Sequence, residues 1–224
     1  MVRTVVCIVG SAVVGGFVGF GLDVMARQVF VTCVGRRNGA ALAIYEDLLS
    51  KDRDYAVAEF SHRQRICYAP AWEELVYRVV PGFVWFYGSA IVWKMIAVVV
   101  WLLAVWFWAI SHWWDTESSL RHGIHLRPHW RTSRVGRNLH RITMTYHAIS
   151  YSAAFVLAGV LSINNPLHAD PFVRAVVFLG TGWLAATSVH SLHNYLLLSP
   201  HHAGQIYRRW RRIPVTAKTP RHKQ

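Results

Sequence analysis

The stretch VVCIVGSAVVGGFVGFGL, from Val5 to Leu22, decides the fold class because its 18 residues carry no charge. A membrane-spanning helix needs about 20 predominantly apolar residues. Ser11, Gly15 and Gly19 recur at intervals of four, so they share one face on which a second helix can approach closely. A cleaved signal peptide is the alternative, but its apolar core would run only about 7–15 residues. We therefore predict a retained membrane helix.

Four further apolar stretches predict additional spans: Ala69–Trp93, Met95–Trp114, Ile142–Ile163 and Pro171–Leu198. Lys94 divides the first pair, and a turn-rich segment at 164–170 divides the second. Ala40–Leu49, with Tyr45, Leu48 and Leu49 on one side, predicts a short amphipathic helix. We expect an all-α fold, a polytopic membrane helix bundle with about five spans plus short amphipathic helices.

Composition and charge agree with this topology. The 224-residue chain is 54% hydrophobic and 16% charged, whereas soluble domains carry about 25% charged residues. Of its 24 Lys and Arg residues, 20 lie in the segments 23–66, 113–141 and 199–224, which five spans would place on one side, expected to be cytoplasmic. No nucleic-acid-binding module is recognisable. The net charge of +13 therefore predicts contact with membrane lipids and no nucleic-acid partner.

Ionisable and amide side chains near the ends of the predicted spans mark a candidate site, because such groups are costly inside a bilayer. They are Glu73, Glu74, Arg78, His112, His190 and Asn194. The second span begins on the basic side, and the third and fifth spans end there. All six side chains are therefore expected at a similar depth near one membrane face.

The two adjacent glutamates are expected to play different roles. Glu74 and Arg78 are helical i, i+4 neighbours and can form an ion pair, while Glu73 points about 100° away. Glu73 would then be available as a general base that takes a proton from water. The alternative is that both acids simply mark the start of a helix.

The remaining candidates can supply hydrogen bonds. His112 could hold the same water as Glu73, or it could be an interfacial residue of an aromatic belt. His190 and Asn194 share a helix face and could stabilise an oxyanion, or they could form ordinary helix–helix hydrogen bonds. His193 faces elsewhere and is predicted to be structural. His147 and His190 could alternatively ligate a haem.

Three motifs in order, Glu73-Glu74-x-x-x-Arg78, Trp108-x-x-x-His112 and His190-x-x-x-Asn194, resemble the CPBP family of intramembrane proteases. Within that family the likeness is to the type II CAAX prenyl proteases. It covers about residues 65–200 and includes Pro70, Thr181-Gly182 and Pro200. The chain has Trp108 where the family usually has Phe. We accordingly divide it into a membrane helix and amphipathic segment at 1–64, a protease domain at 65–200 and a basic tail at 201–224.

The resemblance implies an endopeptidase that removes the last three residues of prenylated Cys-a-a-X proteins such as small GTPases. Glu73 and His112 would activate water, His190 and Asn194 would hold the oxyanion, and Glu74 and Arg78 would support them. It implies a multi-pass protein of the endoplasmic reticulum membrane if the source is eukaryotic, with its active site toward the cytoplasm. We expect no obligatory cofactor or metal. A non-catalytic scaffold of the same fold, and a haem-binding or structural subunit of a larger complex, are the alternatives.

Overall fold

The computed structural model describes residues 2–59, 61–87, 92, 95–96, 98–104, 134–164 and 170–198. Every regular element in these ranges is a helix, and no strand occurs among them, which confirms the all-α prediction. The longer elements are α1 (Val2–Arg37), α2 (Gly39–Glu59), α7 (Arg134–Ile163) and α8 (Pro171–Leu198). Shorter ones follow one another from residue 64: η1 (Gln64–Tyr68), α3 (Ala69–Glu74), η2 (Leu75–Val79) and α4 (Val80–Tyr87).

Three helices, α1, α7 and α8, are long and apolar enough to cross a membrane, so the chain is a membrane helix bundle. They correspond to the first, fourth and fifth predicted spans. The second predicted span falls on the run from α3 to α4, which is helical but interrupted by η2. The third, Met95–Trp114, lies mostly outside the described residues and stays a prediction.

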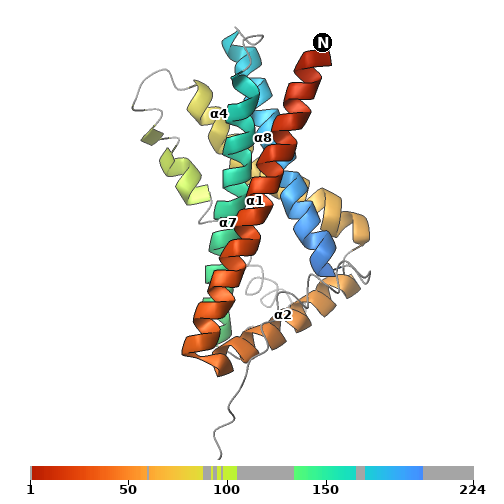
Figure 1. Cartoon of the computed structure of the whole chain (residues 1–224), viewed down its shortest axis with the longest axis vertical. Helices are drawn as coiled ribbons and strands as arrows, with labels where there is room; N and C mark the ends of the chain where they lie inside the picture. The colour runs from red at the N-terminus through yellow and green to blue at the C-terminus, as the bar shows by residue number, and fades with distance from the viewer. Residues whose placement is uncertain are drawn as a thin grey trace, which may run out of the picture.

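The bundle core is formed by α1, α7 and α8, which lie side by side, with α7 running opposite to the other two (Figure 1). Close approach depends on small residues, as the four-residue spacing predicted. A Cβ added to Gly15 would lie 2.6 Å from Cβ of Ala158, and one added to Gly19 would lie 2.5 Å from Cβ of Ala154. Gly19 thus allows α1 to lie almost directly against the backbone of α7.

Helix α2 lies across the end of the bundle where α1 ends (Figure 1). Asn38 separates the two helices, and its Oδ1 accepts a hydrogen bond from the Ala41 backbone N–H at 2.9 Å, an N-cap. Tyr45 and Leu48 are buried, which confirms the predicted amphipathic helix. The Tyr45 hydroxyl lies 2.6 Å from Thr143 Oγ1 and so ties α2 to α7.

The helical run from η1 to α4 carries the glutamate pair and begins with a capping box. Ser61 N–H donates to Gln64 Oε1 at 2.9 Å, and Gln64 N–H donates back to Ser61 Oγ at 3.3 Å. Helix α8 holds this run in place, because Trp183 Nε1 donates to the Ala71 carbonyl at 2.9 Å. The π-helical η2 follows Glu74 directly, and such local π turns often occur at functional sites.

Candidate functional site: a carboxylate–histidine cluster beside an apolar cavity

Glu74 and Arg78 form a buried ion pair at the start of η2, as their spacing predicted. Their side chains are 0% and 1% exposed. Arg78 Nη2 also donates to the Ala148 carbonyl of α7 at 3.1 Å, and its guanidinium lies 5.7 Å from the ring centre of Tyr151. The pair therefore fixes the glutamate-bearing helix against α7. A buried charge pair of this kind is tolerated only when each partner neutralises the other.

His190 of α8 lies between the two glutamates. Its Nδ1 is 2.9 Å from Glu74 Oε1, and its Nε2 is 4.0 Å from Glu73 Oε2. The Glu73 side chain is 25% exposed, in contrast to the fully buried Glu74. The sequence predicted that one acid would be neutralised and the other would stay accessible. In the structure Glu74 is the neutralised acid and Glu73 is the accessible one.

What His190 can do at these contacts depends on its protonation state. A neutral imidazole that donates from Nδ1 to a carboxylate has a lone pair on Nε2. In that tautomer Nε2 would face Glu73 as an acceptor, and the separation of 4.0 Å leaves room for a water that bonds both groups. Nε2 could donate to an oxyanion only if the ring were doubly protonated. A neutral ring would orient a water and a doubly protonated ring would donate to an oxyanion, so the predicted oxyanion role of His190 stays a prediction.

The other two predicted site residues differ in status. Asn194 Nδ2 donates to the Arg65 carbonyl at 3.0 Å, which is the helix–helix hydrogen bond considered as its alternative. This N–H therefore joins α8 to η1 in the conformation described. His112 lies outside the described residues, and its proposed contact with water stays a prediction.

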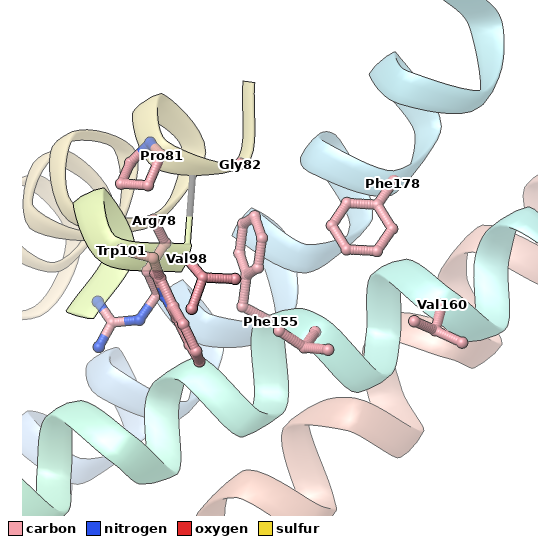
Figure 2. Close-up of a pocket in the computed structure, with 9 residues that line it drawn as sticks. Arg78, Pro81, Gly82, Val98, Trp101, Phe155, Val160 and Phe178 are labelled. Atoms are coloured by element: carbon pink, nitrogen blue, oxygen red, sulfur yellow. The ribbon is translucent and has the colours of Figure 1, made fainter. Parts of the chain in front are cut away.

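An apolar cavity of about 310 Å³ adjoins Arg78. Phe155 and Val160 of α7 and Phe178 of α8 contribute to its wall, and Figure 2 shows Arg78 at one end of the labelled residues and Val160 at the other. The remaining lining residues are Pro81, Gly82, Val98, Trp101 and Val156. Since Arg78 pairs with Glu74, the polar cluster and this apolar space have Arg78 in common.

A second carboxylate–histidine cluster lies among α1, α7 and α8 and was not predicted. Asp23 of α1 contacts His147 Nδ1 of α7 through Oδ1, and its Oδ2 lies 3.2 Å from His193 Nδ1 of α8. All three residues are buried. One sequence signal was available, because Asp23 continues the four-residue spacing of Ser11, Gly15 and Gly19 onto the same helix face. His193, expected to be structural, belongs to this cluster.

The arrangement of the histidines does not favour a haem shared by His147 and His190. Each of these imidazoles has its Nδ1 directed at a different carboxylate, so an iron would have to be ligated through Nε2 of both rings. The Tyr151 ring lies 5.9 Å from His147 and 5.0 Å from His190, measured between ring centres. A haem ligated by both histidines would have to displace this buried tyrosine.

Comparisons with protein families, with curated proteins and with solved structures found no match to this chain.

Proposed function

We propose that this chain is an intramembrane endopeptidase in which Glu73 activates water beside His190. One observation carries the proposal: a partly exposed carboxylate lies 4.0 Å from an imidazole nitrogen whose ring is oriented by a second, buried carboxylate. A general base needs access to water together with a fixed partner. Glu73 and His190 meet both conditions, whereas Glu74 is enclosed and paired with Arg78.

In the proposed reaction, a water between Glu73 and His190 attacks the carbonyl carbon of the scissile peptide bond. Glu73 takes one proton from this water as the C–O bond forms. The tetrahedral intermediate then collapses, the C–N bond breaks and the leaving amine receives that proton. The products are a carboxylic acid on one fragment, which releases the second proton of the water to the solvent, and a free amine on the other. General base catalysis of this kind contributes about 10²–10⁴-fold in rate.

The proposed substrates are prenylated Cys-a-a-X proteins, in line with the resemblance to the type II CAAX prenyl proteases. The apolar cavity supports this choice because it adjoins the polar cluster at Arg78 and is lined by aromatic and aliphatic side chains. A prenyl chain gains about 0.8 kcal/mol for each methylene that it buries. The cavity could therefore hold the lipid while the peptide reaches Glu73. We propose that His112 assists the water and that no metal is obligatory for this step.

The proposed location is the endoplasmic reticulum membrane if the source is eukaryotic, with the active site toward the cytoplasmic side. The end of α1 and the start of α7 lie at the same end of the bundle (Figure 1). Both carry arginines: Arg36 and Arg37 on α1, and Arg134 and Arg141 on α7. An excess of basic residues is typical of the cytoplasmic side, which supports this orientation.

The test is cleavage of a farnesylated Cys-a-a-X peptide by the full chain in liposomes, with the released tripeptide measured by mass spectrometry. Glu73→Gln should lower kcat/KM by about 10²–10⁴-fold, because the amide cannot accept the proton. Asp47→Asn is the matched control, since it makes the same acid-to-amide change at an exposed position on α2. Cleavage by Glu73→Gln at the parental rate would refute the role of Glu73, and no cleavage by the parent chain would refute the proposed activity.

A further inference from the structure

We propose that Asp23, His147 and His193 form a binding site for a divalent transition-metal cation, with Zn²⁺ as the expected ion. The three residues come from three different membrane helices, α1, α7 and α8. Each offers one ligand atom, and these atoms all lie within 4.8 Å of one another. Two imidazoles and one carboxylate are a common ligand set for zinc, with a water completing the tetrahedron.

The distances within the cluster suit a shared cation. Ligands about 2.0–2.2 Å from a tetrahedral zinc lie about 3.4 Å from one another. Asp23 Oδ2 and His193 Nδ1 are 3.2 Å apart, which is close to that separation between two ligand atoms. The contact between His147 Nδ1 and Asp23 Oδ1 would be replaced by ligation.

Burial and charge also favour a cation. The Asp23 side chain is 1% exposed, and a carboxylate removed from water needs a positive partner. Arg27, the next residue on this face of α1, is paired with Glu46 of α2. A dication bound by one carboxylate and two neutral imidazoles would supply the positive partner of Asp23 and join α1 to the α7–α8 pair.

The proposed cation site is separate from the hydrolytic cluster. His190 and His193 belong to the same helix, but the two imidazoles pair with different carboxylates, Glu74 and Asp23. The Tyr151 ring is a neighbour of both imidazoles. Its centre lies 5.0 Å from the ring centre of His190 and 6.4 Å from that of His193. The cation would therefore have a structural role, and its binding does not depend on the proposed protease activity.

The experiment measures zinc bound to the purified full chain in detergent. The protein is stripped with a chelator, equilibrated with ZnCl₂, desalted and analysed by elemental mass spectrometry. The parent should retain about one zinc per chain, and Asp23→Asn and His193→Gln should each fall to the background of a no-protein control. His140→Gln is the matched control, because it changes another buried histidine of α7 and should retain the parental zinc content.

A second readout keeps the proposal testable if a variant folds poorly. Co²⁺ bound in place of Zn²⁺ should give the visible absorption of a tetrahedral site in the parent and lose it in Asp23→Asn, with gel filtration reporting the folded fraction of each protein. Zinc bound by folded Asp23→Asn at the parental level, or no zinc retained by the folded parent, would overturn the proposal. Glu73→Gln should bind zinc normally whether or not the parent cleaves peptides, which separates this result from the test of the protease.

Discussion

The two carboxylate–histidine clusters use similar side chains in different surroundings. Both take a histidine from α8, His190 in one and His193 in the other. In the first cluster, Glu73 is 25% exposed and a neighbouring residue, Arg78, borders an apolar cavity. In the second, Asp23 is enclosed by α1, α7 and α8. Access to water and to an apolar chain suits hydrolysis of a lipidated substrate, whereas enclosure suits a structural ion.

The largest expected effect on this contrast comes from breaking the ion pair in the first cluster. Arg78→Met should lower the free energy of unfolding by about 3–5 kcal/mol, because it leaves the buried Glu74 carboxylate without its cation. Denaturant titration in detergent micelles would measure the change. The double variant Glu74→Gln/Arg78→Met should recover much of that loss, since no unpaired charge remains. A double variant as unstable as Arg78→Met would contradict the assignment of Glu74 as the charge partner.

A smaller effect is expected from a substitution that moves α1 away from α7 next to the second cluster. Gly19→Ala should lower the free energy of unfolding by about 1–3 kcal/mol, because the new Cβ overlaps Ala154 and pushes α1 from α7. If zinc binds, this variant should also release it faster than the parent. Gly21→Ala is the control, since a Cβ there meets nothing within 4 Å. Equal stability of the two variants would contradict the close approach of α1 and α7.

The smallest effect is expected at the contact between α2 and α7, which involves neither cluster directly. Tyr45→Phe removes the hydroxyl that bonds Thr143 and should cost about 1 kcal/mol. The loss should appear in the same denaturant titration, while cleavage by Glu73 stays near the parental rate. A loss of cleavage as large as that of Glu73→Gln would show that α2 contributes to the hydrolytic cluster, which its contacts do not predict.

The sequence predicted the class of fold and the first cluster better than the second, for physical reasons. Uncharged apolar runs and small residues four apart report directly on membrane helices, and the i, i+4 rule placed Glu74 next to Arg78. The pairing of Asp23 with His147 and His193 depends on contacts between three helices that are far apart in the chain. Asp23 immediately follows the apolar run that ends at Leu22, so it was assigned to the following segment and not to the span.

Asn194 illustrates the same limit within the first cluster. Its place on the face of His190 followed from helical spacing, but its hydrogen bond to the Arg65 carbonyl depends on how η1 packs against α8. The contact of His190 Nδ1 with Glu74 also required the position of the glutamate helix. Spacing along one helix therefore predicted that His190 and Asn194 are neighbours. Their hydrogen-bond partners on other helices depend on how the helices pack.

The length of α1 has a mechanical consequence. Its 36 residues form one helix, which is about 54 Å long at 1.5 Å per residue, whereas the hydrocarbon core of a bilayer is about 30 Å thick. Part of α1 must therefore project beyond the hydrocarbon, and it ends next to α2. A continuous helix transmits a tilt along its length, so a displacement of α2 would tilt α1 and move Asp23 relative to α7 and α8.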